Sequence, residues 1–187
     1  MSIAILRRVS AVLFCLMAQA TFAAGLTSFV GLGLGNTTAE VPGSSGQVTA
    51  SGAGYRIVAG SQINPMLSLE AEYVDLGQFT DATSNVSAKG LGASGVISMP
   101  ISGMFSIYGR GGLTRIETTV SPLVGSNAVL PQSDTVVGVS WGYGIQADIA
   151  SNASLRLSWD RYKSSVLAGT FTNRIDMNSS ALLIYRF

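Results

Sequence analysis

Histidine is absent from this chain of 187 residues, and cysteine occurs only once, at Cys15. Without histidine, the Ser-His-Asp and Cys-His catalytic arrangements and all histidine metal sites are excluded. Charged residues make up 11% of the sequence, against about 25% in an average soluble domain. The 11 basic and 10 acidic residues nearly cancel, whereas a nucleic-acid-binding protein would need a basic surplus. Histidine-dependent enzymes are therefore excluded, and nucleic-acid binding is not expected.

The residues that are abundant are apolar residues, at 47%, and glycine, with 22 copies. Disorder requires the opposite balance of few apolar and many charged residues, so the chain is expected to fold. Its length fits a single domain. After residue 23, no stretch approaches the 18 consecutive apolar residues of a transmembrane helix. The apolar residues must be buried in some other way.

The first 23 residues have the three-part composition of a secretory signal peptide. Arg7 and Arg8 precede a largely apolar run over residues 9–18, and small residues follow up to Ala23. A membrane anchor is the alternative, but this run is too short to cross about 30 Å as a helix. We expect residues 1–23 to be the signal peptide and residues 24–187 to form one domain. Removal of the signal also removes Cys15, and leaves nine basic and ten acidic residues because it contains Arg7 and Arg8.

Alternation of apolar and polar residues is the main pattern in the rest of the chain. In residues 137–149 the odd positions are Val, Trp, Tyr, Ile and Ala, while the even positions are Gly, Ser, Gln and Asp. This period of two predicts β-strands with one apolar face. Eight such segments are predicted, at residues 26–36, 48–61, 66–76, 87–99, 104–118, 134–149, 154–163 and 175–187.

The connections between these segments alternate in length. Tight turns are predicted at residues 62–65, 100–103 and 150–153, and longer polar loops near 37–47, 77–86, 119–133 and 164–174. This order predicts an all-β fold, an eight-stranded antiparallel up-and-down transmembrane β-barrel. A soluble sandwich or a lipocalin-like barrel is the alternative, with its apolar face inward. The polar face here is mainly Gly and Ser, which suits the narrow interior of an eight-stranded barrel.

Four segments and the C-terminus resemble the OmpA-like family of eight-stranded outer-membrane barrels. The similar segments are residues 67–77, 108–113, 141–148 and 155–162. Tyr185 and Phe187 resemble the C-terminal signal read by the barrel-assembly machinery, although Leu182 stands where the family prefers Gly. The resemblance implies export through the periplasm to the bacterial outer membrane, with lipopolysaccharide and other outer-membrane lipids as neighbours and a monomeric state. Because the chain ends with the barrel, we do not expect cell-wall anchoring.

Strand parity assigns eight charged residues to the lumen of the predicted barrel. Unpaired charges in a narrow lumen are costly, so these residues are expected to form an ion-pair network. The network either fills and closes the lumen or rearranges as a narrow gated pore. The eight residues are Arg56, Glu70, Glu72, Arg110, Asp148, Arg156, Asp160 and Arg186.

Glu70 and Glu72 also raise the question of catalysis, because two carboxylates on one side of a strand can perform acid–base chemistry. Nearby arginines would keep both ionised, and barrel lipid A deacylases and proteases use histidine, which is absent. We therefore expect no enzymatic activity, no cofactor and no metal site.

The outward parity carries four cations toward the long-loop ends of their strands: Lys89, Arg115, Arg161 and Lys163. Cations at this level attract phosphate groups, which makes them candidate lipopolysaccharide contacts, with ordinary interfacial solvation as the alternative. Aromatic belts are predicted from Tyr55, Tyr73 and Trp159 at the external end and from Phe105, Tyr185 and Phe187 at the periplasmic end.

These features together predict an integral outer-membrane β-barrel with a structural role in the envelope, and narrow pore activity as a further candidate role. The alternative is a surface adhesin or ligand-binding barrel that acts through its external loops. Loops are the usual place for binding residues, but these loops carry few charges and no sequence motif for a ligand.

Overall fold

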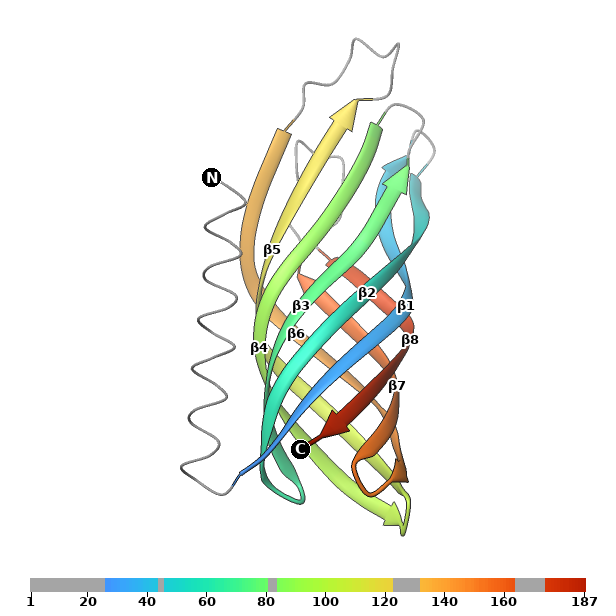
Figure 1. The fold of residues 1–187 in the computed structure, drawn as a ribbon. Helices are drawn as coiled ribbons and strands as arrows, with labels where there is room; N and C mark the ends of the chain where they lie inside the picture. Colours follow the sequence, from blue (N-terminus) through green and yellow to red (C-terminus); the bar gives the residue numbers. More distant parts are fainter. Residues whose placement is uncertain (1–25, 44–45, 81–83, 123–131, 164–173) are drawn as a thin grey trace.

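The computed structural model describes residues 26–43, 46–80, 84–122, 132–163 and 174–187, and nearly all of them form β-strands (Figure 1). The strands are β1 (Thr27–Gly43), β2 (Gly46–Asn64), β3 (Leu67–Thr80), β4 (Ser84–Ser102), β5 (Phe105–Pro122), β6 (Gln132–Ala150), β7 (Ala153–Lys163) and β8 (Arg174–Arg186). Within these ranges, no helix is long and apolar enough to cross a membrane. The predicted signal peptide, residues 1–23, lies outside the described residues.

Each strand pairs antiparallel with the next, and β8 pairs back onto β1 to close the sheet (Figure 1). The predicted fold, an eight-stranded antiparallel up-and-down barrel, is confirmed. In a closed barrel each strand has a neighbour on both sides, so the backbone hydrogen-bonding groups of the wall are satisfied within the sheet. This is the requirement that a sheet must meet in lipid.

Three short turns lie together at one end of the barrel, which we call the turn end (Figure 1). The chain reverses at residues 65–66, 103–104 and 151–152, within the predicted turns. In the first turn, Asn64 Oδ1 accepts hydrogen bonds from the backbone N–H groups of Met66 and Leu67, both at 2.8 Å. This side-chain cap explains why Asn suits a position just before a tight reversal.

At the opposite end, which we call the loop end, the strands are longer than the sequence predicts. β1 and β2 stay paired as far as Gly43 and Gly46, although a loop is predicted over residues 37–47. β3 and β4 pair as far as Thr80 and Asn85, within the predicted loop 77–86. Both faces of a hairpin that projects from a membrane meet water, so the alternation of residue types fades while the backbone ladder continues. The alternation of residue types therefore does not reveal where these strands end.

Gly77 interrupts this ladder in β3. Its φ angle is 82°, in the left-handed region that favours glycine, and the β3–β4 register shifts between Asp75 and Gln78. The Asp75 carboxylate accepts a hydrogen bond from the Gly77 N–H at 2.9 Å. A bulge of this kind bends the strand as it leaves the regular barrel wall.

Candidate functional site

The alternation of the strands brings the predicted charged residues into the lumen. Six of the eight are at most 5% exposed, namely Arg56, Glu70, Glu72, Arg110, Arg156 and Asp160. Asp148 and Arg186 belong to the same face but lie near the turn end, where their side chains are 41% and 19% exposed. The structure thus gathers all eight into one column of ion pairs inside the barrel.

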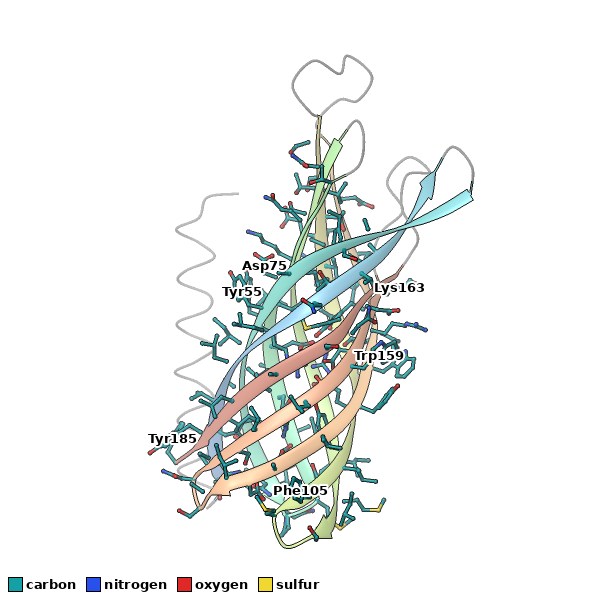
Figure 2. All side chains as sticks on the ribbon, turned by 90° about the vertical axis from the view of Figure 1, so that its right-hand side faces the viewer. Tyr55, Asp75, Phe105, Trp159, Lys163 and Tyr185 are labelled. Carbon is teal, nitrogen blue, oxygen red and sulfur yellow. The ribbon has the colours of Figure 1, made fainter. Side chains whose placement is uncertain are left out.

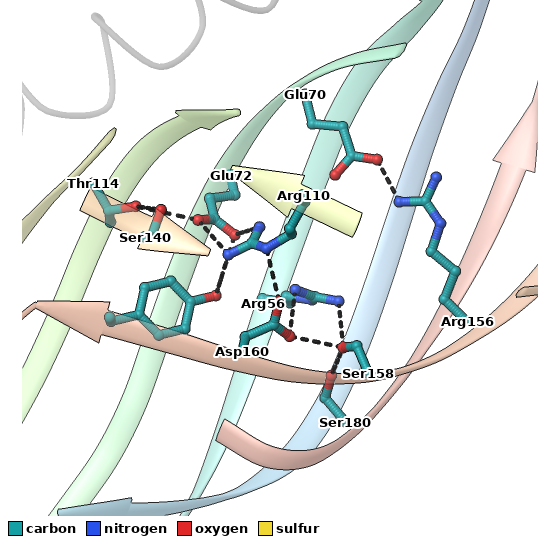
Figure 3. Close-up of polar contacts among 11 residues, drawn as sticks. Arg56, Glu70, Glu72, Arg110, Thr114, Ser140, Arg156, Ser158, Asp160 and Ser180 are labelled. Carbon is teal, nitrogen blue, oxygen red and sulfur yellow. Dashed lines mark hydrogen bonds and ion pairs between the residues drawn. The ribbon is translucent and has the colours of Figure 1, made fainter. Parts of the chain in front are cut away.

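The centre of this column holds two arginines and two carboxylates (Figure 3). Arg110 donates to both carboxylate oxygens of Glu72, at 2.6 and 3.0 Å, and its Nε lies 2.7 Å from Asp160 Oδ1. Arg56 donates to the other oxygen of Asp160 at 3.0 Å. The two positive and two negative charges cancel, which is how charges are tolerated in a dry interior.

Hydroxyl groups add hydrogen bonds to this central cluster. Tyr162 accepts from Arg110 at 2.9 Å and donates to Glu72 at 3.3 Å. Ser158 accepts from Arg56 at 3.0 Å and donates to Asp160 at 2.7 Å. These hydroxyls hold the charged groups in one geometry, because each of them bonds to a cation and an anion at once.

The lumen next to the central cluster, on the turn-end side, is held by Arg156. Its guanidinium pairs with Glu70, donates to Gln146 at 2.7 Å, and lies 4.9 Å from the centre of the Tyr108 ring. Further toward the turn end, Arg186 pairs with Asp148 at 3.0 Å. Around these last charges a polar cavity of about 580 Å³ opens between the turns. This cavity extends from the turns to Arg156.

On the other side of the central cluster, the lumen is filled by apolar side chains. This loop-end cluster consists of Ala39, Val74, Leu76, Phe79, Val86, Ala88, Ile116, Tyr162, Ile175 and Met177, all at most 3% exposed. This cluster was not predicted from the sequence, since the inward face was expected to hold mainly Gly, Ser and charged residues. A signal was present in β3, where the inward positions change from Glu70 and Glu72 to Val74 and Leu76.

A second apolar group, Phe29, Val58, Leu182 and Ile184, also faces the lumen, beside Arg156. Inward glycines make room for these side chains and for the charged residues. A Cβ on Gly142 would lie 2.2 Å from Asp160 Oδ1, closer than any real contact. The glycine content of the polar face thus reflects close packing inside the barrel, as the sequence predicts.

Two of the four cations assigned to the outer wall have acidic partners. Lys89 lies 3.3 Å from Asp75, and Arg161 donates to both oxygens of Asp176 at 2.7 and 2.9 Å. Arg115 is exposed, as predicted for the wall. These side chains are thus available at the surface, although two of them are partly neutralised.

Lys163 does not follow the predicted outward parity. A Cβ on Gly138, a buried inward position, would lie 2.6 Å from the Lys163 Cβ. The Lys163 side chain therefore lies over the lumen side of β6. Lys163 is itself exposed, and its backbone pairs with Arg174 of β8.

The six aromatic residues predicted to form belts have side chains on the wall. Phe105, Tyr185 and Phe187 are 45–63% exposed, and Figure 2 shows Phe105 and Tyr185 toward the turn end. Tyr55 and Trp159 lie nearer the loop end in the same view, with Tyr73 6.1 Å from Tyr55 between ring centres. Two rings outside the predicted belts, those of Trp141 and Tyr143, also contact Trp159, with ring centres 5.0 and 5.4 Å away.

A closed eight-stranded barrel with an apolar outer wall and charges paired inside defines the class of integral outer-membrane β-barrels. In agreement with this, residues 9–187 match the family described as outer membrane protein beta-barrel domain. The chain belongs to this family, and its place is the bacterial outer membrane.

Solved structures with the same fold include Neisserial surface protein A, with a TM-score of 0.69 and 21% identity over 86% of this chain and 97% of that one. Ail, the attachment invasion locus protein of Yersinia pestis, solved in complex with the heparin analogue sucrose octasulfate, has a TM-score of 0.59 and 14% identity over 87% and 99%. The N-terminal barrel of OprF from Pseudomonas aeruginosa has a TM-score of 0.57 and 13% identity over 86% and 97%. No curated protein sequence matches the chain. At these identities the similarity establishes the fold.

Proposed function

We propose that this protein is a structural outer-membrane barrel with a sealed lumen, and that its interactions take place on its outer surface. The observation that carries the proposal is the double closure of the lumen. The loop-end cluster of apolar side chains lies directly next to the central cluster of Arg56, Glu72, Arg110 and Asp160. A gated pore would have to open both layers.

The two layers resist opening for different physical reasons. Parting Arg110 from Glu72 or Asp160 leaves buried charges uncompensated, which costs about 3–5 kcal/mol when one partner is lost. Opening the loop-end cluster would bring water against apolar side chains such as Phe79 and Met177, both at most 1% exposed. The network thus favours closure and stability over conduction.

The same contacts support the absence of enzymatic activity. Glu72 is bound by Arg110, and Glu70 is bound by Arg156. Both carboxylates are therefore engaged in ion pairs inside the lumen. In addition, the loop-end cluster separates both carboxylates from the loop end, so no substrate reaches them from that side.

Several partners follow from this assignment. We infer that the chain is exported through the periplasm, that Tyr185 and Phe187 take part in recognition by the barrel-assembly machinery, and that lipopolysaccharide surrounds the loop end. Arg115 and Lys89, both exposed on the wall, are the cations best placed for lipid phosphates. Closure of the sheet favours a monomer, because the wall offers no strand edge for a second copy.

Conductance recording in planar bilayers tests the sealed lumen. The refolded wild type is expected to give no single-channel steps. Arg110→Ala and Glu70→Ala are also expected to remain closed, because the loop-end cluster is intact in both, and Arg115→Ala on the wall is the control. Steps in the wild type that change in Arg110→Ala and not in Arg115→Ala would contradict the proposal and establish a pore.

Surface binding is the second candidate function, favoured by the sheet that continues at the loop end through the predicted loops. β1 and β2 stay paired as far as Gly43 and Gly46, and β5 and β6 as far as Val120 and Gln132. Projecting sheet of this kind offers backbone groups to an extended partner. The test compares bacteria that display the wild type with bacteria that display a variant whose residues 123–131 are replaced by glycine and serine. Adhesion to surfaces coated with host cells or sulfated glycan, lost in the variant, would establish this function, and equal adhesion would exclude it for this loop.

A further inference from the structure

An apolar groove crosses the outer wall at right angles to the strands. Outward residues that are paired across neighbouring strands form a row on the wall. A second such row lies two residues further along each strand toward the turn end. The first row includes Gly109, Tyr143 and Trp159, and the second includes Ile107, Ile145 and Leu157. The groove lies between these rows and continues over β8, β1 and β2, where Ala181 and Ala53 line it. The small residues at these positions leave a gap, and the large side chains next to them form its sides.

The size and lining of this groove suit hydrocarbon chains. Its volume is about 1230 Å³, above the ~300–1,000 Å³ typical of a pocket for one small ligand. Most of its lining is apolar, including Leu34, Ile97 and Met99. Since the outer wall of the barrel faces lipid, acyl chains are the material that fills it in the membrane.

A bulge in β8 places a polar group at the edge of the groove. Asn178 has no pairing partner on β7 or on β1. This irregularity lets Met177 and Ser180 both point inward, while Asn178 points outward. Its side-chain amide accepts from Trp159 Nε1 at 2.9 Å and donates to Thr38 Oγ1 at 2.7 Å. Bulges often re-aim side chains at functional positions, and this one fixes the orientation of the Trp159 indole.

Next to Asn178, toward the loop end, Arg161 lies against two indole rings. Its guanidinium is 4.8 Å from the centre of the Trp159 ring and 5.6 Å from that of Trp141. The Arg161 guanidinium is also held by Asp176 through two hydrogen bonds. Trp141, Trp159, Asn178 and the Arg161–Asp176 ion pair together form a platform without net charge at the border of the apolar groove. Its side chains are held by these contacts, so the platform is more rigid than a mobile surface lysine would be.

We propose that this groove and platform bind a glycolipid of the outer leaflet, with its acyl chains in the groove and its sugar rings against Trp141, Trp159 and Arg161. The C–H faces of sugars stack on indole rings, and their hydroxyls pair with amide, guanidinium and carboxylate groups. A head group that carried only phosphate would need cations without acidic partners, whereas Arg161 has Asp176. The inference rests on the proposed function, which places the loop end in the outer leaflet.

The sequence supplies its own reporter for the experiment, because Trp141 and Trp159 are the only two tryptophans of the chain. The protein is refolded into phosphatidylcholine nanodiscs that contain increasing fractions of a bisphosphorylated, acylated glucosamine disaccharide. Parallel discs contain phosphatidylglycerol, which is anionic but has no sugar ring. Tryptophan emission in the glycolipid series is expected to change and to saturate, with no saturation in the phosphatidylglycerol series.

The glycines of the wall provide matched variants. Gly109 lines the groove, whereas Gly95 does not, and a Cβ at either position would meet no atom within 4 Å. Gly109→Leu is expected to raise the glycolipid fraction at half-saturation at least about tenfold, which corresponds to ~1.4 kcal/mol. Gly95→Leu is expected to leave it unchanged.

Equal midpoints for the two variants, or the same saturating change with phosphatidylglycerol, would overturn the proposal and leave an ordinary lipid-facing surface. The failure of the proposed function is a different observation. A chain that does not insert into nanodiscs at all, or that inserts without the heat-dependent gel shift of a folded barrel, would contradict the membrane assignment. A protein that inserts and folds but shows no saturable change contradicts this inference alone.

Discussion

The lumen and the outer wall of this barrel are packed in opposite ways. In the lumen, Arg56 and Asp160 are at most 1% exposed, and a Cβ on Gly142 would collide with a carboxylate oxygen. On the wall, Leu183 is 54% exposed, and a Cβ on Gly95 would meet nothing within 4 Å. The tightly packed side is therefore the one that carries the charges, and the apolar side is the open one. Specific protein contacts are concentrated inside, whereas lipid completes the packing outside.

Asp160→Ala should break this arrangement most severely. It removes the carboxylate shared by Arg56 and Arg110 and leaves two buried guanidinium groups with too little negative charge. The free energy of unfolding, measured by urea titration in lipid vesicles, is expected to fall by about 3–5 kcal/mol.

Lys89→Ala on the wall is the control for Asp160→Ala, because the side chain of Lys89, which pairs with Asp75, is 57% exposed. Its effect should be close to zero, as for most exposed ion pairs. If Asp160→Ala does not fold, Asp160→Asn keeps the shape and still removes the charge. Equal losses for the lumen and wall variants would show that the lumen is hydrated.

Two consecutive leucines of β8 allow the next test. Leu182 faces the lumen and is fully buried, whereas Leu183 faces lipid. Leu182→Ala is expected to cost about 2–5 kcal/mol, since it leaves a cavity that the rigid barrel cannot close. Leu183→Ala should cost less than half as much, because lipid chains fill the space and only the transfer part of the loss remains. Urea titration of both variants in the same vesicles measures the difference, and equal losses would mean that the wall is covered by protein.

Glycine-to-alanine changes probe the same contrast at a smaller scale. Gly142→Ala places a methyl group 2.2 Å from Asp160 Oδ1, so it is expected to cost about 1–3 kcal/mol by overpacking. Gly95→Ala on the wall should instead be neutral or stabilising by up to ~0.5 kcal/mol, because alanine restricts the unfolded chain without a clash. Thermal unfolding in detergent compares the two. A stabilising effect of Gly142→Ala would contradict the close packing of the lumen.

The barrel itself could be predicted from the sequence because a wall that faces lipid enforces strict alternation. Each odd residue of 137–149, for example, had to be apolar. Such alternation in each segment predicted the number of strands, their order and which residues face the lumen. The ion pairs of Arg56 and Arg110 followed from the same parity. Their partners could not be chosen from sequence alone, because residues on strands that are not neighbours, such as Arg56 on β2 and Asp160 on β7, meet only across the lumen.

The features that were missed lie where alternation is no longer enforced. The β1–β2 ladder continues through the predicted loop to the Gly43–Gly46 pair, and the side chain of Lys163 lies against Gly138. The bulge at Asn178 shifts the register between β8 and β1, and no pattern of residue types in the sequence predicts this shift. The loop-end cluster was missed for another reason, because inward apolar residues such as Ile116 resemble the apolar residues of the wall when each strand is considered alone.

The smallest effect is expected from Asp148→Ala at the turn end, where lumen and solvent meet. Asp148 accepts hydrogen bonds from Gln146, Ser154 and Arg186, yet its side chain is 41% exposed beside the polar cavity. Water can replace these partners, so the loss of free energy of unfolding should be at most ~1 kcal/mol. A double-mutant cycle of Asp148→Ala with Arg186→Gln, followed by urea titration, isolates the pair. A coupling as large as the loss in Asp160→Ala would show that the turn end is as dry as the centre, and the contrast between a sealed core and an open mouth would then have to be abandoned.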